Sequence, residues 1–214
     1  MSAAGSVVAC VAIGYVCGSL PWGLWLGRLV RGVDVRTLGS GNLGATNVFR
    51  SLGRGLGLTT LLLDIAKGAL PVWFVPGLPI AREFPGGHEA AALTVGLAAV
   101  AGHVWTFLAG WKGGKGVATT VGVLLAVSPR AFGAFVLVFF ATVALTRYIS
   151  LGSILGALAF CVTLAFVAPG GPHGPTFAFG VVIALLVIVR HRENIARLTR
   201  GTERRFEWNR GGAS

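Results

Sequence analysis

Acidic residues, histidine and cysteine are all scarce in this 214-residue chain, and their scarcity excludes several kinds of site. Asp34 and Asp64 are its only aspartates, too few for a lipid phosphotransferase built on a metal-binding aspartate cluster. No histidine is followed by an aspartate five positions later, and the Gly-x-Ser-x-Gly nucleophile turn is missing. The three cysteines have neither Cys-x-x-Cys nor zinc-ligand spacing. The sequence therefore predicts no metal site, no cofactor and no disulfide.

Charge is also low, at 12% of residues, while 54% are hydrophobic and the mean hydropathy is +0.78. Soluble domains carry roughly twice that charged fraction. The 33 glycines suit close helix packing in lipid. We expect an all-α, polytopic integral membrane protein in which residues 1–214 form a single membrane-embedded domain. The net charge of +11 does not indicate nucleic-acid binding, because the basic residues lie at the ends of apolar segments.

Charges and glycine-proline clusters divide the chain into about seven predicted transmembrane helices. The run 148–189 is too long for one crossing, and Pro169–Pro175 divides it into a sixth and a seventh span. No Lys or Arg precedes the first apolar run, so we expect it to stay as a span and not to be a cleaved signal. The first five spans are predicted at 2–27, 56–75, 90–111, 116–129 and 131–146.

Lysine and arginine are distributed unequally between the predicted loops. One set of loops holds only Arg82 and Arg130, whereas the other set holds most of the basic residues. Basic loops face the cytoplasm, so we expect the N-terminus outside and the C-terminus inside, with a basic cytoplasmic tail from about residue 190. That tail is predicted to form a short amphipathic helix, which in part anchors the chain to anionic lipid. The predicted cytoplasmic set is Arg28, Arg31, Arg36, Arg50, Arg54, Lys112, Lys115, Arg147, Arg190, Arg192 and the tail through Arg210.

The first polar group on the predicted cytoplasmic side is a glycine-rich stretch, residues 39–50. Its glycines allow sharp turns and close approach of a ligand, and successive free N–H groups form a concave anion site. A connector with helix-capping serine and threonine is the simpler alternative, but connectors rarely combine three glycines, two asparagines and an arginine. We therefore predict a phosphate-binding loop, whose candidate binding residues are Ser40, Gly41, Asn42, Gly44, Ala45, Thr46, Asn47 and Arg50.

A second group follows His103 and reads Trp-Lys-Gly-Gly-Lys-Gly over 111–116, at the predicted start of a helix. The dipole and free N–H groups of that helix favour an anion. A nucleotide P-loop is excluded, because Gly116 stands where Ser or Thr must follow the lysine and no strand precedes it. Basic residues that only set the orientation are the alternative; the paired glycines favour phosphate contacts from Lys112, Gly114 and Lys115.

Two further groups lie near the C-terminal spans. Ser150 and Ser153 follow Arg147 and Tyr148 and are about one helical turn apart, although an interfacial anchor explains this group equally well. In the second group, His191 and Asn194 share a predicted helical face among the arginines that follow residue 190. A membrane-surface helix explains those arginines, but it does not explain the histidine with the asparagine.

Asp64 and Lys67 are one turn apart inside the second predicted span. Ionisable residues at such depth face the bundle interior and are usually paired or functional. We expect a structural ion pair, and support of the site is the second choice.

The four groups together resemble the bacterial acyl-phosphate:glycerol-3-phosphate acyltransferase family, in order and spacing over nearly the whole chain. The resemblance implies a seven-helix inner-membrane enzyme that faces the cytoplasm. Such an enzyme transfers a fatty acyl group from acyl phosphate to the 1-hydroxyl of glycerol 3-phosphate, which gives lysophosphatidic acid and phosphate. The resemblance also allows a protein partner, namely the enzyme that supplies acyl phosphate. The residues that match substrate-holding positions are Ser40, Arg50, Lys115, Ser153, His191 and Asn194, of which Ser40, Lys115, His191 and Asn194 are expected to be catalytic.

Acyl phosphate is already activated, so positioning and charge neutralisation can supply most of the acceleration. The proton of the attacking hydroxyl goes either to a substrate phosphate oxygen, which the resemblance favours, or to His191. Two other functions stay open, a phosphate-ester transporter and a lipid-binding scaffold without activity. A transporter usually places its site near the midplane between repeated halves; here the polar groups gather at one face. A scaffold leaves the glycines and cations unexplained.

Overall fold

The computed structural model describes residues 1–206, and within them every regular element is a helix. The prediction of an all-α protein is confirmed. Arg210, at the end of the predicted basic tail, lies outside the described residues. The ten α-helices of the described residues are α1 (Ala3–Gly18), α2 (Trp22–Arg31), α3 (Ala45–Leu52), α4 (Arg54–Phe74), α5 (Gly87–Val104), α6 (Val117–Val127), α7 (Pro129–Thr146), α8 (Ile149–Val167), α9 (Pro175–Arg190) and α10 (Arg192–Thr199).

Five helices of the described chain are long and apolar enough to cross a membrane. A sixth candidate is the pair α9 and α10, which is bent by 59°. Helix α6 corresponds to the predicted fourth span, but its 11 residues are fewer than the roughly 20 that a crossing needs. The membrane class is therefore supported, while the count of seven and the orientation of the termini stay predictions. The five long candidates are Ala3–Arg31, Arg54–Gly77, Gly87–Ala109, Pro129–Thr146 and Ile149–Val167.

The first predicted span is interrupted. Helix α1 ends at Gly18, and α2 begins at Trp22 after a short break that contains Pro21. Proline has no N–H to continue the helical hydrogen bonds. The break leaves the backbone carbonyls of Leu20 and Ser19 accessible to the side chains of Lys67 in α4 and of Thr106, which follows α5.

Contacts within the chain divide it into two compact units, Met1–Val127 and Ser128–Ser214, the second described to Phe206. In the first unit α1 packs against α5 and α4 packs against α6. Glycine makes both contacts close: a Cβ on Gly18 would overlap the Ala99 carbonyl group, and one on Gly122 would overlap the Ile65 carbonyl oxygen. Small residues at helix crossings have this effect in membrane proteins.

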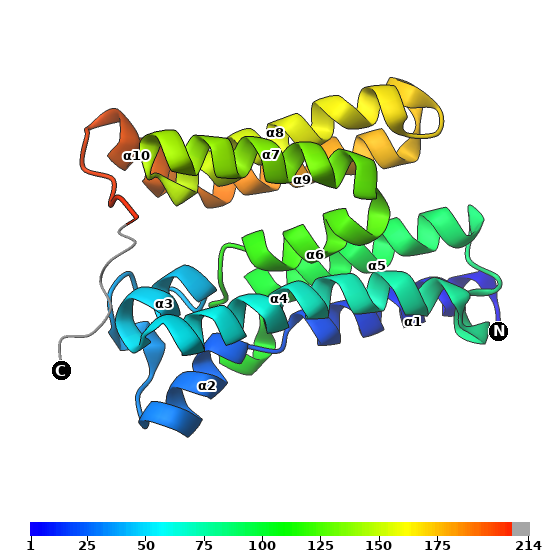
Figure 1. Ribbon diagram of the computed structural model, residues 1–214. Coiled ribbons are helices and arrows are strands. Elements are labelled where there is room, and N and C mark those ends of the chain that lie inside the picture. The colour runs from blue at the N-terminus through cyan, green and yellow to red at the C-terminus, as the bar shows by residue number, and fades with distance from the viewer. Residues whose placement is uncertain (207–214) are drawn as a thin grey trace. The chain divides into compact units, whose positions relative to one another are not determined.

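The loops of the first unit that carry the predicted phosphate site lie at one end of it. Figure 1 shows α2 and α3 at that end and the N-terminus at the opposite end of the unit. Helix α3 packs against the start of α4, and the short 3-10 helix η1 (Val35–Thr37) contacts α2 and α3. This placement agrees with the predicted orientation, in which the N-terminus is outside and the basic loops face the cytoplasm.

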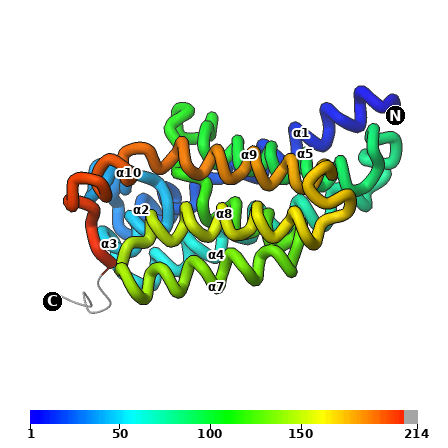
Figure 2. Tube along the Cα trace, turned by 90° about the horizontal axis from the view of Figure 1, so that it is seen from above, coloured from blue at the N-terminus to red at the C-terminus, as the bar shows by residue number. Residues whose placement is uncertain are grey.

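In the second unit, α8 packs against both α7 and α9, and the three helices run side by side in Figure 1 and Figure 2. The predicted break at Pro169–Pro175 is confirmed, since α8 ends at Val167 and α9 begins at Pro175. The predicted tail helix is α10. Beyond it the chain returns to the turn between α7 and α8, where the Phe206 N–H donates to the Arg147 carbonyl at 2.7 Å.

The close approach of α1 and α5 can be tested with Gly18→Ala. The added methyl group would meet backbone, which cannot move aside as a flexible side chain can, so we expect a loss of about 1–3 kcal/mol in stability. Thermal unfolding of the detergent-solubilised chain measures it. Gly55→Ala in α4 is the control, because its Cβ would have no heavy atom within 4 Å; we expect that variant to be as stable as the parent or slightly more so. Equal unfolding temperatures for the two variants would contradict the packing.

Candidate active site

The first glycine-rich loop is organised by the side chain of Asn47, which is 5% exposed. Its Nδ2 group donates to the carbonyl oxygens of Val35, Leu38 and Asn42 at 3.0–3.2 Å. Its Oδ1 atom accepts from the Ser40 N–H at 2.9 Å. This one amide thus closes the loop from both sides. The geometry gives Asn47 a part in shaping the loop, while substrate contact by Asn47 stays a prediction.

Glycine at position 39 is required by this arrangement. Gly39 has a φ of +59°, and a Cβ there would overlap Asn47 Oδ1. Gly41 has a φ of +68°, also in the region that favours glycine. Asn42 then accepts from the Gly44 N–H at 2.8 Å, directly before α3 begins at Ala45.

The outer surface of the loop carries the predicted phosphate ligands. Ser40, Thr46 and Arg50 are exposed, the first on the loop and the other two on α3. N–H groups in the first turn of a helix have no acceptor within the helix, and the helix dipole favours an anion there. A rigid loop with hydroxyl, amide and guanidinium donors on its exposed side is suited to phosphate.

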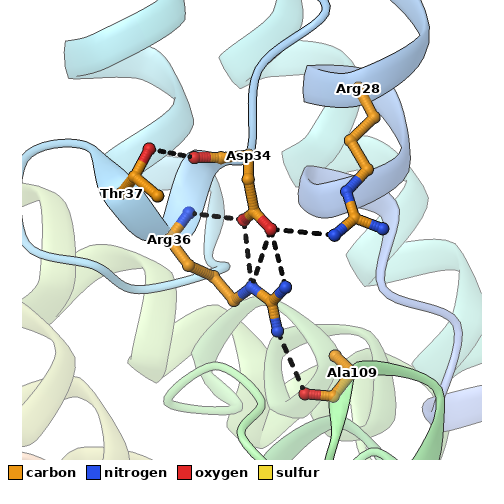
Figure 3. A network of polar contacts seen from close by, with 5 residues as sticks. All are labelled: Arg28, Asp34, Arg36, Thr37 and Ala109. Carbon is orange, nitrogen blue, oxygen red and sulfur yellow. Dashed lines mark hydrogen bonds and ion pairs between the residues drawn. The ribbon is translucent and has the colours of Figure 1, made fainter.

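A second network holds the segment that precedes the loop, as Figure 3 shows. Asp34 accepts hydrogen bonds from Arg36 at 2.6–3.2 Å and from Arg28 at 2.9 Å. Arg36 also donates to the Ala109 carbonyl at 3.3 Å, and Thr37 donates to the Asp34 carbonyl at 2.8 Å. The Arg36 bonds, more than those of Arg28, hold the pKa of Asp34 well below its usual range. Through Arg36 and Ala109, the network joins the segment before the first loop to the segment before the second glycine-rich stretch, residues 111–116.

The second glycine-rich stretch, residues 111–116, forms a turn that is hydrogen-bonded to the C-terminal end of α5. The Gly113 N–H donates to the Val104 carbonyl at 3.1 Å, and the Gly114 N–H donates to the His103 carbonyl at 3.2 Å. Lys112 is exposed and Lys115 is half-buried. Within the first unit, the two groups that the sequence predicted to bind phosphate adjoin one another, because Leu43 of the first and Gly114 of the second line the same cavity.

The predicted ion pair in α4 is confirmed, with Lys67 Nζ 2.8 Å from Asp64 Oδ1. The sequence did not predict its surroundings. His103 Nδ1 lies 3.7 Å from the same carboxylate oxygen. A cavity of about 10 Å³, which is room for about one water molecule, adjoins all three side chains together with Leu43 and Gly114.

In the second unit His191 is buried, at 3% exposed, where α9 ends and α10 begins. Its Nδ1 lies 2.8 Å from the Val187 carbonyl oxygen. Because that oxygen can only accept, Nδ1 carries a proton and Nε2 is the nitrogen that can accept one. Ser153 is 1% exposed, and its hydroxyl donates to the Ile149 carbonyl at 2.9 Å within α8.

Glu203 connects the two predicted groups of this unit. One oxygen, Oε1, accepts from Asn194 Nδ2 at 2.6 Å and from the Ser150 hydroxyl at 2.7 Å. The other accepts from Arg197 Nε at 2.7 Å. Burial alone would raise the pKa of Glu203, but these hydrogen bonds outweigh it and hold the pKa below its ordinary value. The carboxylate thereby holds Asn194 beside the start of α8.

Sequence reasoning assigned no role to Glu203, Asp34 or His103. A signal was present for the first two, because each is a lone carboxylate among arginines in a chain with few acids. His103 belongs to the second polar group of the sequence, but its proximity to Asp64 could not be predicted, because Asp64 belongs to another helix. The resemblance gave a substrate-binding role to Ser153 and none to Ser150, yet Ser150 is the serine that bonds to Glu203.

A sequence model of the family described as glycerol-3-phosphate acyltransferase matches residues 8–201. A relative from Geobacter sulfurreducens named glycerol-3-phosphate acyltransferase is 50% identical over 196 residues, which cover 92% of this chain and 95% of the relative. One from Anaeromyxobacter sp. strain Fw109-5 with the same name is 46% identical and covers 92% and 94%.

Two solved structures share the fold. One is a crystal structure of PlsY (YgiH), an integral membrane glycerol 3-phosphate acyltransferase, in its glycerol 3-phosphate form, with a TM-score of 0.83 and 40% identity. The other is the same protein in its lysophosphatidic acid form, with a TM-score of 0.81 and 39% identity. Each match covers 95% of this chain and 96% of the other.

The role of Glu203 can be tested with Glu203→Gln. We expect a loss of about 1.5–3 kcal/mol near neutral pH, because charge-assisted hydrogen bonds are replaced by neutral ones. The folded pKa of Glu203 lies below its unfolded value, so its stabilisation is present above about pH 4.3 and is lost as the pH falls through the lower folded pKa. The difference in unfolding temperature between parent and variant should therefore shrink in acid. Glu193→Gln, at an exposed site in the first turn of α10, is the control. If the difference in unfolding temperature between the parent and Glu203→Gln did not change with pH, the stabilising role of the Glu203 carboxylate would be contradicted.

Proposed function

Because the chain belongs to the glycerol-3-phosphate acyltransferase family, we propose that it transfers a fatty acyl group from acyl phosphate to the 1-hydroxyl of glycerol 3-phosphate. The products are lysophosphatidic acid and inorganic phosphate. The observation that supports phosphate recognition most directly is the pair of glycine turns at one end of the first unit, joined by the hydrogen bond from Arg36 to Ala109. Both turns present donors and cations suited to an anion.

In this proposal, the two substrates are divided among the polar groups. The 39–47 loop, through Ser40 and its backbone N–H groups, holds the phosphate of acyl phosphate. The residues proposed to hold glycerol 3-phosphate are Arg50, Lys115, Ser153, His191 and Asn194. That residues of the two units act on one pair of substrates is part of the proposal.

The chemistry needs no covalent enzyme intermediate. The 1-hydroxyl oxygen attacks the carbonyl carbon of acyl phosphate, a carbon–oxygen ester bond forms, and the bond from carbon to the phosphate oxygen breaks. The cations neutralise negative charge as phosphate leaves, and the loops hold the reacting atoms in line. The hydroxyl proton goes to a substrate phosphate oxygen, while His191 orients glycerol 3-phosphate. The reaction is proposed to take place at the cytoplasmic face of the bacterial inner membrane, with acyl phosphate supplied by a partner enzyme.

The donor can be tested with the purified chain in detergent. We expect lysophosphatidic acid and an equal amount of inorganic phosphate when acyl phosphate and glycerol 3-phosphate are both present. Acyl coenzyme A in place of acyl phosphate should give no product. The measurement also separates an enzyme from a transporter, because a detergent solution has no compartments. Product formed from acyl coenzyme A and glycerol 3-phosphate, but not from acyl phosphate, would overturn the proposed donor.

The acceptor of the proton can be tested with His191→Ala. If a substrate oxygen accepts the proton, the variant should bind glycerol 3-phosphate more weakly, with a raised KM, and retain measurable kcat. Steady-state kinetics with both substrates varied gives the two constants. His173→Ala, at an exposed histidine of the same unit, is the control. Loss of turnover with an unchanged KM would instead make His191 the general base.

A further inference from the structure

Three ionisable side chains are buried together in the first unit, away from its exposed loop surface. Asp64 is 1% exposed, and Lys67 and His103 are each 6% exposed. They come from two apolar helices, α4 and α5, that are long enough to cross a membrane. Ionisable groups in such segments are costly, and when retained they usually have a function. The reaction proposed above assigns no part to any of the three.

Lys67 ties α4 to the break between α1 and α2. Its Nζ atom lies 2.8 Å from Asp64 Oδ1 and donates to the Leu20 carbonyl at 2.6 Å. Thr106, just after α5, donates to the neighbouring Ser19 carbonyl at 2.5 Å. The middle of α4 and the end of α5 are thereby held to two neighbouring carbonyl groups, Leu20 and Ser19 respectively.

His103 lies between this ion pair and the second glycine turn. On one edge, its Nδ1 is 3.7 Å from Asp64 Oδ1. On the other edge, its Nε2 faces Gly114 so closely that a Cβ on that glycine would overlap it. The His103 carbonyl in turn accepts the Gly114 N–H at 3.2 Å. Both the ring and the backbone of His103 therefore define where the turn lies, and Lys115 is the next residue along.

The same cluster adjoins the first loop. The cavity beside Asp64, Lys67 and His103 is lined by Leu43 of the first loop as well as by Gly114 of the second turn. Apolar side chains of similar volume would fill this space at least as well, because a buried ion pair often adds little to stability. They would not, however, direct the imidazole ring toward the turn.

We infer that Asp64, Lys67 and His103 are positioning residues that set the Lys112–Gly116 turn and, through it, the ammonium group of Lys115. The inference deepens the proposed function and rests on the role of Lys115 in it. Asp64 and Lys67 fix the ring of His103, and the ring supports the turn against which glycerol 3-phosphate binds. Displacement of a binding group by about 1 Å can cost up to a hundredfold in rate.

The test is a double-mutant cycle between His103→Leu and Lys115→Met in the full chain. Leucine removes the polar atoms of His103 while it keeps an apolar side chain of comparable bulk. We expect His103→Leu to lower kcat/KM for glycerol 3-phosphate by about 10–100-fold, mainly through KM. In the Lys115→Met background the same substitution should change kcat/KM by less than about twofold, because the group that it positions is already gone. If His103→Leu acted only by disturbing the structure, the fold-losses in kcat/KM of the two single variants would instead multiply in the double variant.

The controls separate folding, this inference and the proposed function. His88→Leu is the same substitution at an exposed site at the start of α5 and should leave kcat/KM unchanged. Thermal unfolding shows whether His103→Leu folds; if it does not, His103→Gln, which keeps a polar side chain, enters the same cycle. Unchanged kinetics in the His103 variant, or losses that multiply, overturn the inference while leaving the proposed function intact. A wild-type kcat/KM in Lys115→Met overturns the proposed role of Lys115 and the inference with it.

Discussion

Buried polar groups must find partners within the protein where little water reaches them, and the loops of this chain are built around that requirement. The Asn47 amide gathers backbone groups from both sides of the first loop. Asp34 gathers the side chains of Arg28 before it and Arg36 after it, and Glu203 gathers those around α10. In each case one side chain binds several donors or acceptors from different residues. These three residues thereby hold the conformation of the segments around them.

This arrangement has a consequence for binding. Since the inner hydrogen bonds of the first loop are made by Asn47, the exposed donors Ser40, Thr46 and Arg50 stand on a backbone that is already ordered. A ligand that meets such donors does not bear the entropic cost of ordering the loop. For an activated acyl donor, whose reaction needs mainly positioning and charge neutralisation, a preorganised loop can contribute much of the rate.

The scarcity of carboxylates gains a meaning from the structure. Asp34, Asp64 and Glu203 each lie beside a cation of their own network and neutralise it. Most of the remaining cations are not balanced by acids, in a chain with a net charge of +11. That excess suits the binding of phosphate-bearing substrates and agrees with an orientation set by basic loops.

Most helices and the break at Pro169–Pro175 were predictable from the sequence, because apolar runs, prolines and glycine clusters act locally. The Pro169–Pro175 break, the short tail helix and the Asp64–Lys67 pair one turn apart are examples. The break at Pro21 within the first predicted span was not predicted. The two glycine-rich stretches were also identifiable as phosphate-binding candidates from composition alone. What composition did not indicate is that Asn47 faces inward while its neighbour Thr46 is exposed.

The tertiary structure alone decided which distant groups meet. Asp64 and His103 belong to different helices, and Glu203 meets Ser150 only because the chain returns past α10 to the start of α8. No local periodicity encodes such pairings, since they arise from how the helices pack and where the chain turns back. The sequence by itself therefore determined the membrane class, most helices and the chemistry of the loops. Packing determined which buried side chains hold those loops in place, because a buried polar group is satisfied by whichever partner the fold brings within reach.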